Sequence, residues 1–367
     1  YSQQKIVNPE ESDKAAAIQE KWMEFYNQSG KSLIEDLKKR YPIKKGENEN
    51  VYNKAIQARS FDILRGFLPA GTTTFLSWHT NLRQAYDKLT ILRHHPLPEV
   101  RKITMEIHQA LMEKYPHSFS HKTYSDQEAY NGLWSDEFTY FLPDNHPEFE
   151  LESNIDLEGL EKFQEILATR PAKTNLPNFL GMFGQFTFKF LLDFGSYRDI
   201  QRHRNGEILM PLLSTKYGFQ QWYLEQLPQK MREKALELIG EQTKRINELQ
   251  VSDFEKQYYL AMGFNVPITA TFKLPAAIYV AELRSGKNVH PTLRVQAQKM
   301  GLALREAVPN LKVHIDDNKD QKTPIYKRLV LSKIGSNNFN ISTEFKGKPI
   351  SVKYVNYVAN ATQKLEA

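Results

Sequence analysis

Residues 194–219 read FGSYRDIQRHRNGEILMPLLSTKYGF, the densest run of anion-binding side chains in the sequence. At its centre stands Arg202-His203-Arg204, whose guanidinium groups can fork onto phosphate oxygens while the imidazole donates, accepts or carries a proton. Asn205-Gly206 then predicts the end of any preceding helix. The stretch is typical of a nucleotide site, and the alternative is the basic, solvated end of a helix that reaches Arg198.

The composition is that of a folded protein with room for two domains, since 40% of its 367 residues are hydrophobic and 25% are charged. A net charge of +6 favours anionic partners such as nucleotides or nucleic acid. The absence of cysteine excludes disulfides, thiolate-bound zinc and a cysteine nucleophile. The ten histidines are scattered, so the sequence predicts no metal site.

The sequence predicts neither a membrane span nor a secretory signal. It has no run of about 18 apolar residues, and its start, YSQQKIVNPEE, lacks a basic region followed by an apolar one. We therefore expect a cytoplasmic protein without a membrane partner. Because the sequence does not begin with Met, we also expect it to be part of a longer polypeptide.

Helices are predicted on both sides of the opening stretch from apolar residues at helical spacing. One long apolar helix, residues 178–198, is expected to lead directly into Arg202-His203-Arg204. The others are expected at residues 15–26 and 33–41 with a break at Ser29-Gly30, at 51–67, twice between 68 and 116, and at 160–167, 228–249, 251–262, 274–284 and 291–307.

Beyond Pro309 the pattern changes to alternating β-branched and aromatic residues, which predicts an antiparallel sheet. Its strands are expected at residues 313–315, 325–334, 339–345 and 350–358. The predicted fold class is therefore α+β. Residues 119–177 are acidic, aromatic and rich in proline, which is typical of a linker or insertion. The predicted domains are 1–118, 119–177 and 178–367.

The two halves of the chain share an internal pattern. Leu92-Arg93, Val100-Arg101 and Pro116 recur as Leu283-Arg284, Leu293-Arg294 and Pro309, and Pro69 is matched with Pro267. Counting back from Arg93 and Arg284 places Asn81 and Arg83 opposite Phe272 and Leu274, and counting back from Pro69 and Pro267 places Arg65 opposite Gly263. The first copy therefore carries polar residues that the second has lost, which predicts that one copy bears a site and the other supports it.

These motifs resemble the flavin-dependent thymidylate synthase family. The Arg-His-Arg signature is matched at residues 202–204, and a second set is matched by Arg65, Leu68-Pro69, Asn81-x-Arg83, Leu92-Arg93 and Glu99-x-Arg101, in the reverse of the family's order. The resemblance covers residues 51–116 and 180–309. One position departs from the signature: Leu212 stands where the family has Ser, and Ser214-Thr215-Lys216-Tyr217 follows two residues later with Lys in place of Arg.

The resemblance implies two thymidylate-synthase-complementing-like units, a homo-oligomer (a dimer of tandem units), and reductive methylation of dUMP to dTMP. The co-substrates would be NADPH and methylenetetrahydrofolate, and the cofactor FAD. It implies catalytic roles for Arg202, Arg65 and Ser214, nucleotide binding by Arg65, Arg93, Arg202 and Lys216, and FAD binding by His203, Arg204, Asn81 and Arg83.

Two alternatives stay open at this point. One is a degenerate member of the family that binds a nucleotide or flavin, or only stabilises an assembly. The departure at Leu212 favours it. The other is a nucleic-acid-binding protein, which the basic balance and the lysines of residues 322–353 favour, although we consider this partner less consistent with the motifs.

Overall fold

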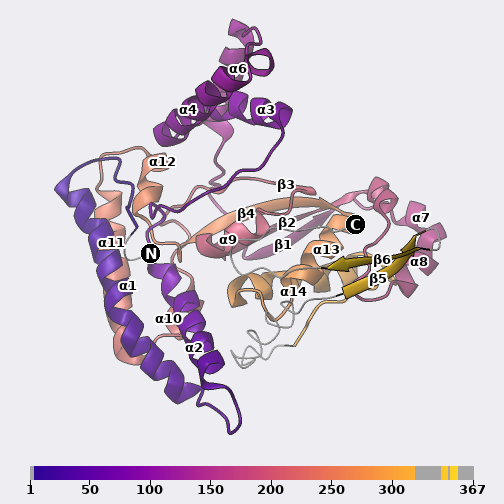
Figure 1. Ribbon diagram of the computed structural model, residues 1–367. Helices are drawn as coiled ribbons and strands as arrows, with labels where there is room; N and C mark the ends of the chain where they lie inside the picture. The colour runs from indigo at the N-terminus through magenta and orange to yellow at the C-terminus, as the bar shows by residue number, and fades with distance from the viewer. Residues whose placement is uncertain (1–3, 319–339, 346–347, 354–367) are drawn as a thin grey trace. The chain divides into compact units, whose positions relative to one another are not determined.

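The computed structural model describes residues 4–318, 340–345 and 348–353 (Figure 1). The chain divides into two compact units: Tyr1–Leu33 with Asp62–Asp317, and Ile34–Phe61 with Asn318–Ala367. The predicted α+β class is confirmed, since the larger unit combines helices with one antiparallel sheet. No helix among the described residues is long and apolar enough to cross a membrane.

The four-stranded sheet has the order β1-β2-β4-β3, in which every neighbouring pair is antiparallel. Its strands are β1 (Phe149–Ser153), β2 (Gln185–Asp193), β3 (Gly206–Ile208) and β4 (Asn265–Lys273). In β2 the four apolar residues Phe186, Phe188, Phe190 and Leu192 alternate along the chain and are all fully buried. This period of two fits a strand with one buried face.

The helix expected at residues 178–198 is therefore wrong. Apolar content suggested one long helix, but the alternation over β2 decided the structure. The helical parts of this span are the 3-10 helix η3 (Asn178–Phe183) before β2 and α9 (Phe194–Ile200) after it. The helix expected at 251–262 is reduced to α12 (Asp253–Lys256) and a 3-10 turn. The strand β4 that follows was missed, and β1 lies within the stretch interpreted as a linker or insertion.

Two long helices cover the buried face of the sheet (Figure 1). They are α13 (Leu274–Arg284) and α14 (Pro291–Ala307), as the sequence predicted, and both pack on β2. Each helix carries a proline in its first turn, where no intrahelical N–H partner is lost. The even-numbered residues of β4, from Val266 to Phe272, are fully buried beneath them.

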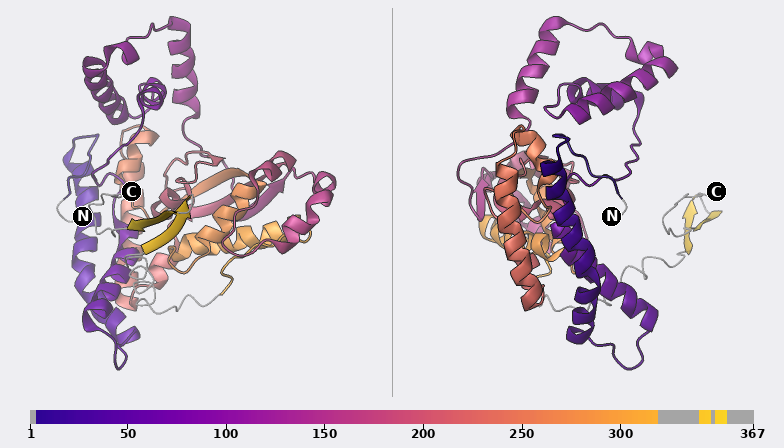
Figure 2. Two further views of the ribbon diagram at one scale, coloured as in Figure 1. Left: turned by 45° about the vertical axis from the view of Figure 1, so that its right-hand side comes forward. Right: turned by 90° about the vertical axis from the view of Figure 1, so that its left-hand side faces the viewer.

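The remaining helices connect and flank this core. The helix α1 is continuous through Ser29-Gly30, where a break was expected. In both views of Figure 2 the first half of α1 lies beside α11, and Lys21 pairs with Glu241 at 3.4 Å. The bounds of these remaining helices are α1 Asp13–Arg40, α2 Glu49–Leu64, α3 Leu82–Leu92, α4 Pro98–Lys114, α5 Pro116–Phe119, α6 Ser125–Phe138, α7 Leu157–Leu160, α8 Gln164–Thr169, α10 Gln221–Glu225 and α11 Gln229–Asn247.

The internal repeat is present, in a different register from the one read off the sequence. The 3-10 turns η1 (Arg65–Phe67) and η4 (Gln257–Tyr259) begin 192 positions apart (257 minus 65), as do α3 and α13 (274 minus 82). The helices α4 and α14 begin 193 apart (291 minus 98), and both have 17 residues. We name residues 5–8, 65–92 and 98–114 the first repeat, and residues 218–221, 257–284 and 291–307 the second repeat.

The two repeats contact one another through equivalent residues. Their matching turns form a short antiparallel bridge, so that each hydrogen bond has a counterpart in the opposite direction, as in a two-fold symmetric dimer interface. The bridge joins Pro69 to Ala261, with Ala70 N–H donating to Leu260 O at 2.8 Å and Met262 N–H donating to Leu68 O at 2.8 Å. The two repeats are thus paired about a local two-fold axis within one chain.

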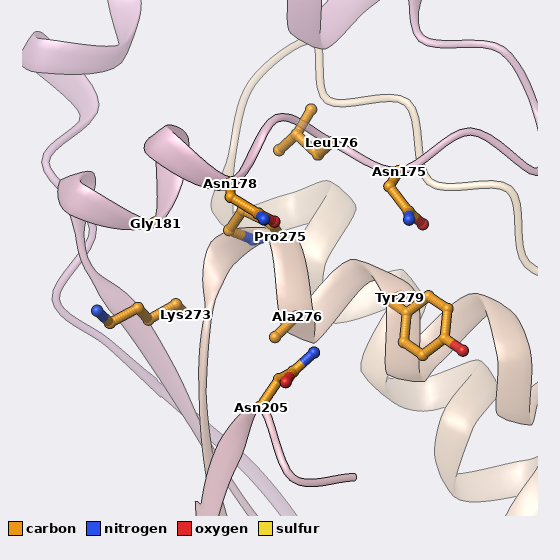
Figure 3. Close-up of a pocket in the computed structure, with 9 residues that line it drawn as sticks. All are labelled: Asn175, Leu176, Asn178, Gly181, Asn205, Lys273, Pro275, Ala276 and Tyr279. Carbon is orange, nitrogen blue, oxygen red and sulfur yellow. The ribbon is translucent and has the colours of Figure 1, made fainter.

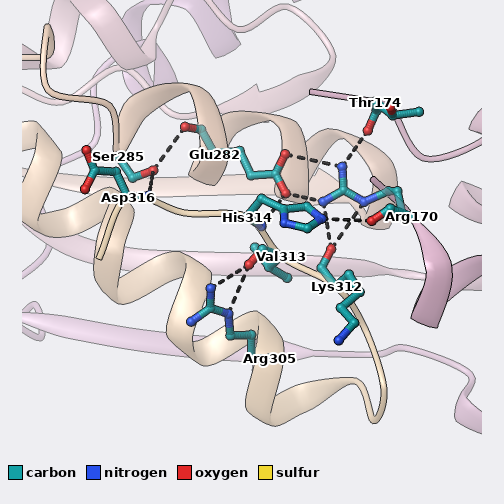
Figure 4. A network of polar contacts seen from close by, with 9 residues as sticks. All are labelled: Arg170, Thr174, Glu282, Ser285, Arg305, Lys312, Val313, His314 and Asp316. Carbon is teal, nitrogen blue, oxygen red and sulfur yellow. Dashed lines mark hydrogen bonds and ion pairs between the residues drawn. The ribbon is translucent and has the colours of Figure 1, made fainter. Parts of the chain in front are cut away.

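Arginines hold the last described residues of the larger unit in an extended course along α14 (Figure 4). Arg170 Nη2 donates to Lys312 O at 2.7 Å, and Arg305 Nη2 donates to Val313 O at 2.6 Å. The strand expected at residues 313–315 is therefore wrong, because guanidinium groups and not a neighbouring strand bind these carbonyl groups.

The smaller unit contains the end of α1, most of α2 and a two-stranded antiparallel sheet. Its strands are β5 (Asn340–Phe345) and β6 (Lys348–Lys353), which confirm the strand expected at 339–345 and the start of the one expected at 350–358. The strand expected at 325–334 lies outside the described residues.

Candidate functional site

A cavity of about 450 Å³ lies where the chain leaves Arg202-His203-Arg204 and where α13 begins (Figure 3). Asn205 lines one side, and the carboxamides of Asn175 and Asn178 lie on the other. The ring of Tyr279 stands at one end, whereas the ammonium group of Lys273 points away from the carboxamides. The remaining lining residues are Leu176, Gly181, Pro275 and Ala276.

Local structure explains how these side chains are placed. Asn205 follows α9 directly and precedes the short strand β3, whose Gly206 pairs with Phe272 so closely that a Cβ atom would lie 2.2 Å from the Phe272 ring. Lys273 ends β4 and is the residue before α13. Gly181 lies against Lys273, with space for a Cβ only at 3.3 Å from that side chain. Strands β3 and β4 therefore position Asn205 and Lys273 on one wall, and Gly181 of the opposite wall packs against Lys273.

The three residues of the Arg-His-Arg motif have different surroundings. Arg202 is 75% exposed and lies 3.8 Å from the carboxylate of Asp199. Arg204 is also exposed. Both guanidinium groups therefore reach solvent within three residues of Asn205, where an anionic ligand could meet them.

His203 is turned inward. Arg284 donates from Nε to His203 Nε2 at 2.8 Å, and the imidazole ring meets Tyr279 edge-on with 6.1 Å between ring centroids. Burial and the neighbouring Arg284 charge lower the pKa of His203 to about 4. The imidazole is thus neutral near pH 7, accepts a hydrogen bond at Nε2 and forms part of the support behind Tyr279.

Arg65 lies in a buried polar cluster instead of in this cavity. Its Nη2 donates to Ser196 Oγ at 3.2 Å, and Ser196 Oγ also lies 3.1 Å from His290 Nδ1. Asp193 accepts from Tyr223 OH at 2.8 Å. Burial alone would lower the pKa of Arg65, but Tyr223 and Asp193 outweigh it and raise the pKa. Arg65 therefore joins the first repeat to α9, and its predicted nucleotide role stays a prediction.

Residues Asn81, Arg83 and Arg93 belong to α3 or its ends. The Asn81 side chain accepts from Gln84 N–H at 2.9 Å and so caps the helix, and Arg83 is exposed. Arg93 forms a close ion pair with Glu128 of α6. Among the described residues, no cavity and no hydrogen bond brings these three together with Arg202, His203 and Arg204.

Lys216 and Ser214 lie after the motif, in a loop that binds the segment following α6. Lys216 Nζ donates to Pro143 O at 2.8 Å and pairs with Asp144 at 3.2 Å. Ser214 Oγ accepts from Lys216 N–H at 3.3 Å and lines a separate cavity of about 100 Å³. The structure brings neither residue to the cavity at Asn205.

The corrected register changes which residues of the two repeats correspond to one another. Arg65 corresponds to Gln257, which begins the matching 3-10 turn, and not to Gly263. Asn81 and Arg83 correspond to Lys273 and Pro275, and not to Phe272 and Leu274, because α3 and α13 start at Leu82 and Leu274. The cavity at Asn205 therefore sits at the second repeat's equivalent of the Asn81-x-Arg83 position.

None of the nine lining residues was among the site residues expected from the sequence. Asn175 lay within the stretch interpreted as a linker, and Asn178 lay in the helix that is wrong. Tyr279 lay on a helix that was correctly predicted, but nothing distinguished it from a core aromatic. The one available signal was its position on α13 between buried Ile278 and Val280, which leaves it on the outer face.

The sequence resembles proteins of unstated activity. It is 27% identical over 310 residues to a UPF0159 protein of Chlamydia pneumoniae, covering 71% of this chain and 57% of that protein. It is 22% identical over 300 residues to a UPF0159 protein of Thermoplasma acidophilum, covering 71% and 60% respectively. No family profile matches the sequence. The chain therefore spans less than two thirds of the length of these relatives.

Proposed function

We propose that the chain binds a pyrimidine nucleoside monophosphate in the cavity at Asn205, and that this binding serves flavin-dependent methylation of dUMP to dTMP. One observation carries the proposal: a single cavity joins Asn205, the residue after the Arg-His-Arg motif, to Lys273 and Pro275, the equivalents of Asn81 and Arg83. Its volume of about 450 Å³ falls within the range of roughly 300 to 1,000 Å³ that is typical of small-ligand sites.

The lining residues and the neighbouring arginines offer the three contacts that such a ligand needs. Each carboxamide of Asn175, Asn178 and Asn205 presents a donor and an acceptor, which complements the alternating carbonyl and N–H groups of a uracil edge. The half-exposed ring of Tyr279 can stack on a base. Arg202 and Arg204 do not line the cavity, but both are exposed within three residues of Asn205 and offer cations for a phosphate.

The family resemblance implies FAD, which when bound would supply a hydride drawn from NADPH, while methylenetetrahydrofolate supplies the carbon of the new methyl group. The residues expected to hold FAD do not fit it as one set. His203 accepts from Arg284, and Asn81 caps α3. We therefore assign the cavity at Asn205 to the nucleotide and not to the flavin.

Calorimetric titration with dUMP tests the binding. We expect saturable binding, and we expect Tyr279→Ala and Asn205→Ala each to weaken it about tenfold, the effect of losing one stacking or polar contact worth about 1.4 kcal/mol. Lys287→Ala is the matched control, because Lys287 is exposed on the loop after α13 and does not line the cavity. Absence of binding, or equal binding by all variants, would contradict the proposal.

A second function, nucleotide binding without chemistry, is favoured by a specific observation. In the second repeat, Lys273 and Pro275 replace the Asn and Arg of the first, and His203 is neutral and engaged with Arg284. An assay for dTMP formation from dUMP, with FAD, NADPH and methylenetetrahydrofolate added, separates the two functions. Bound dUMP without dTMP formation would favour the non-catalytic one.

A further inference from the structure

Residues 73–80 of the first repeat correspond in position to strand β4 of the second repeat. They are framed by equivalent features on both sides: Thr72 and Phe264 each form an isolated bridge, to Ile6 and Phe219 respectively, and α3 and α13 follow. The backbone bonds match as well, since Thr73 N–H donates to Lys5 O at 2.9 Å and Asn265 N–H donates to Gly218 O at 2.8 Å. The two segments are thus equivalent residue by residue, yet residues 73–80 form no strand.

The side chains of this segment are those of a strand that lacks its sheet. Leu76 is 90% exposed, whereas its counterpart Ile268 is fully buried. Trp78 is 45% exposed, and its counterpart Ala270 is fully buried. Phe75, directly before Leu76 in the chain, is 96% exposed. Exposure of three large apolar side chains in sequence marks a surface that another polypeptide covers.

The second repeat shows what covers such a segment. Both neighbours of β4, the strands β2 and β3, come from one continuous stretch, residues 185–208, which also contains α9 and Arg202-His203-Arg204. We name it the β2–α9–β3 module. Its backbone is joined to the second repeat by Gly195 N–H donating to Met262 O at 2.8 Å and Phe194 N–H donating to Phe264 O at 3.0 Å. Ala70 and Thr72 hold these acceptor positions in the first repeat.

We propose that residues 73–80 are the acceptor strand for a second polypeptide module of the β2–α9–β3 type. The described residues contain one such module, and it is already paired with β4 along both edges of that strand. A second copy of this chain would therefore bring no free module. The chain spans 57% and 60% of the length of two relatives, so a polypeptide of their length has room for another module of this size.

The docked module would add strands by main-chain hydrogen bonds, and Leu76 and Trp78 would become buried between it and the α3–α4 hairpin. It would also place the end of its own α9 equivalent beside Asn81 and Arg83, as Asn205 lies beside Lys273 and Pro275. This inference does not rest on the proposed function, because it concerns backbone pairing and needs no nucleotide.

The test is a fusion in which residues 177–220 are repeated before Tyr1 of the full chain, joined by a flexible Gly/Ser linker that keeps the effective concentration high. Hydrogen exchange of residues 74–80 is then compared with that of the unfused chain. We expect exchange to slow by at least about 100-fold, since a paired strand exchanges only after opening. The fluorescence of Trp78 should shift to shorter wavelength as the indole leaves water.

Leu76→Asp in the fusion is the control, and it should abolish the protection. The residue is 90% exposed in the chain alone, so the substitution leaves the rest of the fold intact. Exchange that stays fast in the fusion would overturn the proposal. Protection already present in the unfused chain, together with a dimer by sedimentation, would also overturn it, in favour of pairing between two copies. Neither result depends on whether dUMP binds.

Discussion

The helix pairs α3–α4 and α13–α14 have the same design in different surroundings. In both, an 11-residue helix is followed by a 17-residue helix with proline in its first turn. The second pair lies on the sheet, whereas the first has a small core of its own around Ala85, Leu89 and Phe119. Helices therefore form from local signals in either place, but residues 73–80 do not become a strand without neighbours.

One feature of the hairpins is independent of the sheet. Arg101 Nη1 donates to His95 O at 2.7 Å, and the equivalent Arg294 donates from Nε to Ser285 O at 2.8 Å. Each arginine thus sits in the first turn of the longer helix and binds carbonyl groups of the loop before it. The loop is fixed by the hairpin itself, and the sheet adds only burial, since Arg294 is the more buried of the two.

The largest expected contrast is between Ile268 and Leu76, which are equivalent positions. Ile268→Ala should lower the free energy of unfolding by about 2 to 5 kcal/mol, because it opens a cavity beneath α13 and α14. Leu76→Ala should change it by less than about 0.5 kcal/mol, since the side chain is exposed. Urea denaturation measures both. Equal losses would show that residues 73–80 are already covered.

Replacing the equivalent arginines Arg294 and Arg101 should give stability losses that differ less than those at Ile268 and Leu76. Arg294→Ala removes a buried hydrogen bond to Ser285 O and an ion pair with Asp316 at 3.3 Å, so we expect a loss of about 2 to 3 kcal/mol. Arg101→Ala should cost about 1 kcal/mol, because water can replace its partly exposed bonds. Thermal unfolding of both variants checks this. A larger loss for Arg101 would reverse the comparison.

At the bridge between the repeats we expect only a small contrast. A Cβ atom at Gly71 would meet Tyr258 O at 2.7 Å, and one at Gly263 would meet Gly66 O at 2.8 Å, which are equivalent contacts. At Gly263 the Cβ would also meet the Phe219 ring at 2.3 Å. Gly71→Ala and Gly263→Ala should therefore each cost about 1 to 3 kcal/mol.

The control for this pair is Gly240→Ala in α11, where a Cβ meets nothing within 4 Å. It should stabilise the protein by about 0.5 to 1 kcal/mol, because alanine favours the helix. Chemical denaturation of the three variants is the measurement. A loss at only one of the two bridge glycines would show that the local two-fold symmetry does not extend to packing.

The last prediction concerns pH and the contact of His203, in the β2–α9–β3 module, with Arg284 of the second repeat. The pKa of His203 in the folded chain, about 4, lies below its ordinary value of 6.5, so the unfolded chain takes up the proton first as pH falls. The stability that neutral His203 provides is complete above about pH 6.5 and is lost between 6.5 and 4. The imidazole resonances should titrate near pH 4, and Arg284→Gln should raise that midpoint.

The sequence allowed the helix pairs and the repeat to be predicted, because capping residues, prolines and helical spacing are local signals. The sheet was not predicted at β2, although Phe186, Phe188 and Phe190 alternate, since a run rich in phenylalanine was interpreted as an apolar helix. The register of the repeat was also wrong, because matching Pro69 with Pro267 gave prolines more weight than the turns around them. The turns pair Pro69 with Ala261.

The site residues expected from the sequence stay predictions. The cavity begins at Asn205, the residue after Arg204, and Arg202, His203 and Arg204 do not line it. Arg65 could not be placed from sequence, because its burial depends on Ser196, 131 positions away, and on the fold that joins them. Lys216 likewise binds Pro143 O, a contact set by a loop and not by any motif.

The exposed segment 73–80 has a practical consequence for anyone who handles the isolated chain. An exposed apolar segment that can pair as a strand is a template for uncontrolled growth, since each added molecule presents the same segment to the next. The exposed side chains of Phe75 and Leu76 favour hydrophobic contacts between molecules at this segment. Turbidity should therefore rise steeply with protein concentration, and Leu76→Asp should delay it. The same two side chains would thus govern both correct assembly and precipitation.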